Sequence, residues 1–190
     1  MFTNTTAENS IPLILAATGL DPITFYGKLL DVGCGRNANF VEYLRRRGIP
    51  ADGIDPRVEK EADYLMHSDA SSIPRPDRYY DFATATTVFF DYGTEASRYF
   101  LTALRGGTVA SREEPQARKR MVGAVREISR VLKTGSRPVI WPEPRNLINH
   151  SAREITELNV EISREDVPEC YAQRGSLLDE NSYRTVLTKL

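Results

Sequence analysis

Cysteine is scarce in this sequence of 190 residues, where only Cys34 and Cys170 occur, far apart along the chain. Two distant cysteines form neither a disulfide framework nor the ligand spacing of a metal site. The sequence therefore predicts no bound metal. A reducing compartment is the simplest environment for such a chain, so we expect a cytoplasmic protein.

Long hydrophobic runs and a net charge of one sign are also missing. The apolar run at residues 11–17 is short and follows no basic residue, so we expect neither a signal peptide nor a membrane span. Twenty-five Lys and Arg against 26 Asp and Glu give a formal charge of −1. This balance does not indicate a nucleic-acid or membrane partner.

Charge is uneven along one segment. Residues 104–137 hold nine Lys or Arg and three Glu, which leaves a net charge of +6. A solvated helix face is the simplest interpretation. The alternatives are a protein partner that docks on the basic helix 112–133, or binding of RNA or an acidic protein.

Strands and helices alternate along the chain, which is long enough for one core, so we predict a single domain over 1–190. The expected strands are 28–33, 51–55, 63–67, 79–90, 137–141 and 182–190. The expected helices are about 10–18, 37–47, 95–104, 111–132 and 151–158. Right-handed crossovers then give an α/β fold with a doubly wound, Rossmann-like sheet and helices on both faces.

A glycine turn follows the first strand in the stretch "LLDVGCGRNANF". Gly33, Gly35 and Ala38 fit the pattern G-x-G-x-x-A, and Asp55 lies 20 residues beyond Gly35. This spacing indicates a ligand that contains a nucleoside and leaves NAD open. Asp31, two residues before the first glycine, would repel a pyrophosphate but suits an ammonium or sulfonium group. It favours S-adenosylmethionine, unless Asp31 only binds local N–H groups.

Several segments together resemble the class I S-adenosylmethionine-dependent methyltransferases, especially the small-molecule, quinone-biosynthesis-like group. They are "LLDVGCGRN", "GIDP", "HSDASSIP", "YYDFATATTVFF" and "REISRVLKTGSRPVIWPEP", in the family's order over about residues 27–144. The resemblance implies a seven-stranded, mostly parallel sheet with an antiparallel last strand, for which "SYRTVLTKL" is in the right place. It also implies a single-domain enzyme that methylates a small-molecule acceptor and releases S-adenosylhomocysteine.

The resemblance also implies roles for single residues. Asp31 would lie near the methionine amino group, above the turn of Gly33 and Gly35. Asp55 would bind the ribose hydroxyls, and Pro56 would pack on the adenine.

Three further residues complete the implied cofactor site. Asp69 would accept a hydrogen bond from the adenine amino group, and the Ala70 N–H would donate to a ring nitrogen. Thr86 would line the methionine end, unless it is a strand residue that binds its own backbone.

The sequence departs from the family pattern in two places. Asn37 replaces the third glycine, and we expect it to keep the turn because asparagine tolerates a positive φ. Only 14 residues separate Asp55 from Asp69, so the helix between these strands is predicted to be one turn or missing.

Methyl transfer requires alignment more than a dedicated base, and no secure catalytic motif is present. Asp91 and His150 follow strands at the ligand edge and are the candidate bases, although either can instead cap a helix or lie on the surface. His67 is predicted to be structural, and Cys34 a small buried apolar residue. A non-catalytic subunit that binds S-adenosylmethionine or S-adenosylhomocysteine is the main alternative function.

Overall fold

A computed structural model describes residues 11–59, 62–86, 114–141, 160–166 and 183–190 of the chain. The helices are α1 (Ile11–Thr18), α2 (Asn39–Arg45) and α4 (Glu114–Val131). The strands are β1 (Leu29–Val32), β2 (Ala51–Ile54), β3 (Leu65–Met66), β4 (Phe82–Thr86), β5 (Val139–Trp141), β6 (Val160–Asp166) and β7 (Tyr183–Lys189).

The strands form one mixed sheet in the order β3-β2-β1-β4-β5-β7-β6. Strands β1 to β5 pair in parallel, whereas β7 is antiparallel to both β5 and β6. The predicted mostly parallel α/β sheet with an antiparallel last strand is confirmed. Strand β3 is only two residues long, so six longer strands carry the sheet and β3 adds a short edge.

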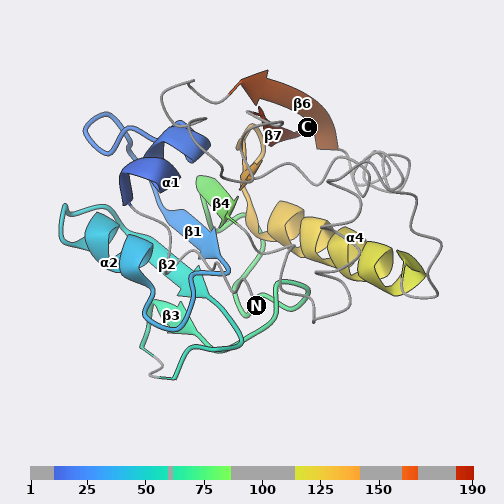
Figure 1. The fold of residues 1–190 in the computed structure, drawn as a ribbon, viewed down its shortest axis with the longest axis horizontal. Helices are drawn as coiled ribbons and strands as arrows, with labels where there is room; N and C mark the ends of the chain where they lie inside the picture. Colours follow the sequence, from blue (N-terminus) through green and yellow to red (C-terminus); the bar gives the residue numbers. More distant parts are fainter. Residues whose placement is uncertain (1–10, 60–61, 87–113, 142–159, 167–182) are drawn as a thin grey trace, which may run out of the picture.

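Helices cover both faces of this sheet in the described part of the chain (Figure 1). Side chains alternate along β1, so Leu29 packs with α1 and α2 whereas Leu30 packs with α4. The α1–α2 face is closed by Ile14 and Phe40, both fully buried. The sheet therefore has a separate apolar core on each side.

Helix α4 packs on the sheet through a stripe of apolar side chains that continues just past its end. Val125, Ile128 and Leu132 are buried against the sheet. The chain after the helix is fixed by backbone bonds, since the Tyr80 N–H donates to Val131 O and the Lys133 N–H donates to Tyr80 O. The helix is thereby tied to the start of β4.

The predicted and observed elements differ in one place, and some predicted elements lie outside the described residues. Strand β6 occupies residues for which neither a strand nor a helix was predicted. The described residues between β2 and β3 contain no helix, as the short spacing predicted. The helices predicted at 95–104 and 151–158 and the end of the strand predicted at 79–90 lie outside the described residues.

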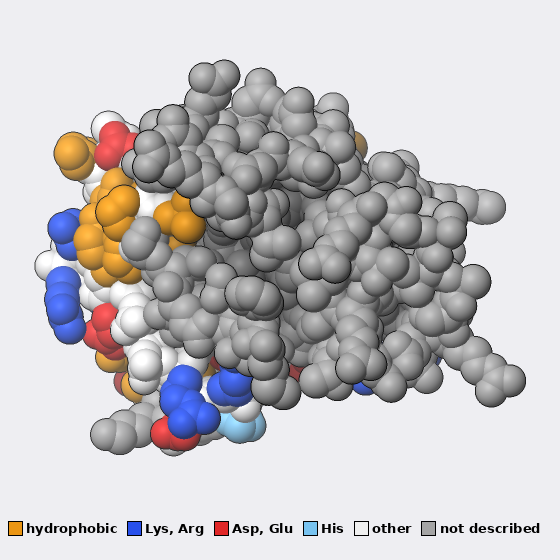
Figure 2. Space-filling view, viewed as in Figure 1, with side chains coloured by type: hydrophobic (Ala, Val, Ile, Leu, Met, Phe, Trp, Pro, Cys, Tyr) orange, Lys and Arg blue, Asp and Glu red, His pale blue; other side chains and the backbone are white. Residues whose placement is uncertain are grey.

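The basic segment is partly used inside the fold. Lys119, Arg120 and Arg126 are exposed, but Arg130 pairs with Glu127 and with a second acid, and Lys133 also binds a carboxylate. Cations and anions are interspersed on the described part of the face in Figure 2.

Within the described ranges, no helix is both long and apolar enough to cross a membrane, and no group of three or more potential metal ligands occurs.

Candidate functional site

The sheet reverses its direction of growth between β1 and β4, because β2 and β3 extend it one way and β4 and β5 the other. In open α/β sheets, ligands bind at the carboxyl ends of the strands at such a switch point. Asp31 of β1 and Thr84 of β4 are direct neighbours across it. The Thr84 hydroxyl donates to Asp31 Oδ1 at 2.8 Å.

Asp31 is fully buried, and its Oδ1 accepts the bond from Thr84. Its Oδ2 has no hydrogen-bond partner among the residues that the structure describes. Burial raises the pKa of Asp31 to about 7, the Thr84 hydroxyl opposes this rise, and the negative charge of Asp55 adds to it. An unpaired buried carboxylate is costly unless a cation or donor meets it, so this position fits a cationic ligand group.

The turn after β1 is held by its own backbone. Gly33 and Gly35 have φ values of 75° and 74°, which glycine adopts without strain. The N–H groups of Gly33 and Cys34 donate to Ile54 O, and the Gly35 N–H donates to Asp55 Oδ2 at 2.9 Å. These three N–H groups bind protein acceptors, so they are not donors for a phosphate.

The positive φ expected at Asn37 is instead found one residue later. Ala38 has φ 46° and forms the N-cap of α2, and Asn37 is exposed. Ala38 is fully buried in the α2-side core, and this packing offsets a conformation that alanine disfavours. The turn is kept, as expected, but the non-glycine residue with a positive φ is Ala38 and not Asn37.

Asp55 follows β2 directly and is 2% exposed. Besides the Gly35 N–H, it accepts three hydrogen bonds from Arg57. The Arg57 backbone N–H and Nε donate to Oδ1 at 2.8 and 3.0 Å, and Nη2 donates to Oδ2 at 3.0 Å. Asp55 thus joins the glycine turn to the end of β2 and forms a two-pronged ion pair with Arg57.

The turn after β1 packs closely against β2. Cys34 is fully buried, and burial raises the pKa of its thiol, so it is a packed apolar residue as predicted. A Cβ at Gly53 of β2 would lie 2.8 Å from the Cys34 sulfur and 3.0 Å from Val41 Cγ2. Glycine at position 53 therefore lets the turn and α2 sit directly on β2.

The remaining expected cofactor residues lie at the same edge of the sheet. Pro56 and Asp69 are exposed, and Asp69 Oδ1 accepts bonds from the N–H and hydroxyl of Ser71. Ala70 is buried in the core under α4, and Thr86 is fully buried at the end of β4. The Gly35 N–H joins Asp55 to the turn, and the Thr84 hydroxyl joins Asp31 to β4.

Asp91 and His150 lie outside the described residues. His67 is exposed just after β3, and its Nδ1 lies 2.9 Å from Val58 O, in line with the structural role that the sequence predicted. Sequence reasoning missed Thr84 and Arg57. The sequence does hint at Arg57, because a cation two residues after an acid can fold back and pair with it. It does not reveal Thr84, because the contact with Asp31 depends on the register of β4 beside β1.

No protein-family model matches the chain, and no curated protein matches its sequence. Solved structures do resemble the fold. An S-adenosylmethionine-dependent methyltransferase from Thermotoga maritima superposes with a TM-score of 0.50 at 14% identity, over 97% of this chain and 92% of that chain. A TehB-like S-adenosylmethionine-dependent methyltransferase from Corynebacterium glutamicum gives 0.51 at 16%, over 86% and 80%.

A third similar structure comes from a complex. It contains the Haloferax volcanii Trm112 methyltransferase activator and a protein classed as a methyltransferase, and the match has a TM-score of 0.54 at 14% identity over 93% of this chain and 87% of that chain. Identities this low establish the fold alone. The chain therefore has the Rossmann-like fold of class I S-adenosylmethionine-dependent methyltransferases, and the comparisons do not single out the quinone-biosynthesis-like group.

Proposed function

We propose that the chain is a single-domain methyltransferase that binds S-adenosylmethionine at the carboxyl edge of β1, β2 and β4 and methylates a small molecule. One observation carries the proposal: Asp31 is buried at the switch point with an oxygen that has no partner among the described residues. A ligand with an ammonium and a sulfonium group supplies the missing positive charge. The fold of the neighbouring structures supports the same cofactor.

The turn supports this cofactor over NAD. A pyrophosphate in this position needs backbone N–H donors. The N–H groups of Gly33, Cys34 and Gly35 already serve Ile54 and Asp55. The buried charge of Asp31 would also repel a pyrophosphate.

Each site residue is assigned one part of the cofactor. In this proposal Asp31 binds the methionine ammonium, Asp55 the ribose hydroxyls, and Thr86 lines the methionine end.

The adenine is assigned to Pro56, Asp69 and Ala70. Asp69 Oδ1 serves the turn with Ser71, and in the described part of the chain Oδ2 is open to the adenine amino group.

The chemical step requires little from the chain. The acceptor attacks a methyl carbon that the sulfonium already activates, and alignment of the two in a dry site can lower the barrier by about 7–11 kcal/mol. Asp91 and His150 remain the proposed bases for an acceptor that holds its proton tightly.

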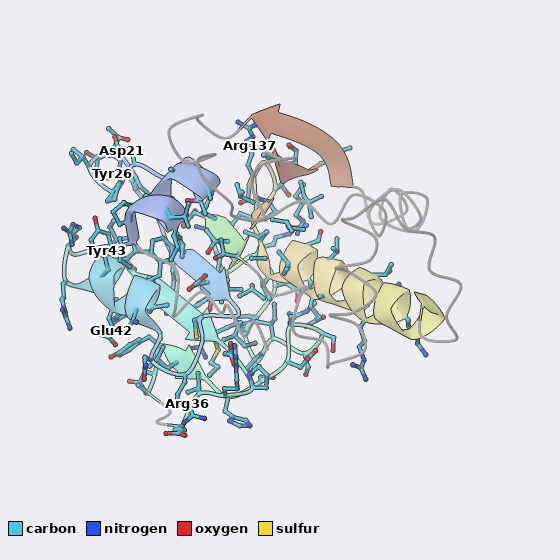
Figure 3. All side chains as sticks on the ribbon, viewed as in Figure 1. Asp21, Tyr26, Arg36, Glu42, Tyr43 and Arg137 are labelled. Carbon is cyan, nitrogen blue, oxygen red and sulfur yellow. The ribbon has the colours of Figure 1, made fainter. Side chains whose placement is uncertain are left out.

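Calorimetric titration with S-adenosylmethionine, S-adenosylhomocysteine and NAD tests the proposal. We expect the first two to bind and NAD not to bind. Asp31→Asn should weaken both adenosyl ligands by a factor of about 10 or more, because a charge-assisted bond is lost. Asp21→Asn is the matched control, since Asp21 is exposed on the loop after α1, away from the sheet edge (Figure 3). Equal losses for the two variants, or binding of NAD alone, would refute the site.

A non-catalytic binding subunit is the second candidate. The ion pair of Arg57 with Asp55 favours this second candidate, because a carboxylate that already accepts bonds from a guanidinium binds ribose less tightly. One structural neighbour comes from a complex of a methyltransferase activator, and by analogy the exposed Lys119, Arg120 and Arg126 of α4 are the proposed partner surface. Formation of S-adenosylhomocysteine in a broad acceptor screen, alone and with candidate partners, separates an enzyme from a binder.

A further inference from the structure

Asp55 has all of its acceptor positions filled by protein donors. A carboxylate offers about four lone-pair sites, and Asp55 accepts four hydrogen bonds. One comes from the Gly35 N–H and one from the Arg57 backbone. The other two come from the Arg57 guanidinium, one to each carboxylate oxygen.

We propose that the Arg57 guanidinium and the ribose hydroxyls of the adenosyl ligand compete for Asp55, so that Arg57 sets the affinity of the site. The inference rests on the proposed function. A ribose offers two neighbouring hydroxyl donors, and the guanidinium fork offers two neighbouring N–H donors. Both need the same two positions on Asp55.

The four bonds differ in how easily they can be exchanged. The N–H groups of Gly35 and Arg57 belong to the backbone and keep the carboxylate oriented when the side chain leaves. The Arg57 side chain is 35% exposed, whereas that of Asp55 is 2% exposed. The guanidinium can therefore move into water while the acid stays in place.

The exchange has a cost for the ligand. When Arg57 leaves, the neutral ribose replaces a cation beside a buried negative charge, and a two-pronged charge-assisted pair is broken. The apparent affinity equals the intrinsic affinity multiplied by the fraction of molecules in which Arg57 is displaced. Removal of the guanidinium should remove this cost, which is the opposite of what loss of a merely structural residue does.

The test is a comparison of S-adenosylhomocysteine affinities by calorimetry for the wild type, Arg57→Ala and Arg57→Lys. We expect Arg57→Ala to bind about five- to tenfold more tightly. Arg57→Lys keeps the charge but loses the fork, so its affinity should lie between the two. Arg36→Ala is the matched control, because Arg36 pairs with Glu59 at the surface, with 63% of its side chain exposed, and points outward (Figure 3).

A second comparison ties the effect to the ribose. The ratio of affinities for adenosine and 2′,3′-dideoxyadenosine measures the hydroxyl bonds in each variant. If Arg57 competes with these hydroxyls, the ratio should be larger in Arg57→Ala than in the wild type, by the same factor as the gain for S-adenosylhomocysteine. Far-ultraviolet circular dichroism checks that each variant is folded.

The outcomes separate this inference from the proposed function. If the wild type binds S-adenosylhomocysteine and Arg57→Ala binds equally or less tightly, the competition is refuted and the proposed function stands. If folded samples of neither protein bind, both are refuted. If Arg57→Ala does not fold, Arg57→Lys decides, because tighter binding than the wild type supports the competition and equal or weaker binding overturns it.

Discussion

Asp31 is the residue at which stability and function oppose each other. Its carboxylate is fully buried, with one oxygen bound to Thr84 and the other without a partner in the described part of the chain. A folded protein tolerates such a group only at a cost in stability. We interpret this cost as the consequence of a site arranged for a cation.

The cost should depend on pH in a defined direction. Burial raises the pKa of Asp31 from 3.8 to about 7, so the folded state keeps its proton to a higher pH than the unfolded state. The free energy of unfolding of the wild type should therefore fall as pH rises through this window, by up to about 4 kcal/mol. Asp31→Asn cannot lose a proton, so urea unfolding at pH 5 and pH 8 should show a smaller fall for this variant.

The fall in the free energy of unfolding from pH 5 to pH 8 differs between the two proteins only through Asp31, because all other titrating groups are the same. The variant should also be the more stable of the two at pH 8, by about 1–2 kcal/mol, because it buries no charge. Unsatisfied N–H donors of its amide offset part of the gain. Parallel pH profiles for the variant and the wild type would show that Asp31 ionises in the fold as it does in water.

Single residues also show what the sequence could and could not predict about the site. Asp31, Gly33, Gly35 and Asp55 lie together as their spacing predicted, because a strand, a tight turn and the next strand fix them locally. Thr84 could not be predicted, because its contact depends on the register of β4 beside β1.

At the scale of elements, substitution of two glycines by alanine should change the stability of the protein in opposite directions. Gly53→Ala would place a methyl group 2.8 Å from the Cys34 sulfur, and we expect a loss of about 1–3 kcal/mol in the free energy of unfolding. Gly123 lies inside α4, where a Cβ would meet Ser71 Cβ at 3.5 Å and no other described atom within 4 Å outside the helix itself. Gly123→Ala should stabilise the protein by about 0.5–1 kcal/mol because alanine favours a helix.

Urea unfolding of the two variants measures both effects on one scale. Equal destabilisation by the two substitutions would show that α2 and the turn do not pack on β2 as closely as the structure has them. Gly53 matters for function as well, because it lets the turn that carries Gly35 approach Asp55.

One side chain of α4, that of Arg130, makes several bonds to the segment before β4. Arg130 forms ion pairs with Asp77 and Glu127, and its guanidinium donates to the carbonyls of Ile73 and Arg75. Arg130→Ala should lower the free energy of unfolding by about 1–2 kcal/mol, since two buried or half-buried carbonyls lose their donors. Thermal or urea unfolding checks this.

Arg126 offers the control for this prediction. It lies one turn earlier on the same helix and is exposed. Arg126→Ala should change stability by less than about 0.5 kcal/mol. If the two variants behave alike, the basic residues of α4 act only through their charge.

The elements themselves were predicted unevenly. Strands β1, β2, β4 and β5 follow from apolar runs bounded by turn residues, and α4 follows from its stripe of buried side chains. Strand β6 was missed because Val160 and Ile162 alternate with polar residues only briefly before Arg164, and its only pairing in the described sheet is with β7, at the far end of the chain.

For the whole molecule, the account predicts stabilisation by the ligand. S-adenosylhomocysteine at 100 times its Kd should raise the free energy of unfolding by about 2.7 kcal/mol at pH 8, and Tm by about 5–10 °C. At pH 5.5 and the same ligand concentration, protonated Asp31 should reduce this gain to about 1 kcal/mol. A thermal-shift assay at the two pH values tests this, and a shift independent of pH would exclude Asp31 from the site.

The sheet as a whole explains why these residues form one site. Its order changes direction between β1 and β4, so the ends of both strands and of β2 lie on one edge. That arrangement could be predicted from the alternation of strands and helices. The exchange between Arg57 and a ribose could not, because it depends on side-chain bonds that only the folded chain shows.

A crystal structure of the protein with S-adenosylhomocysteine tests the central claim most directly. The account predicts the ligand ammonium within hydrogen-bond distance of Asp31 Oδ2 and the ribose hydroxyls on Asp55, with the Arg57 guanidinium displaced. A ligand bound elsewhere, with Asp31 Oδ2 still unpaired, would contradict it.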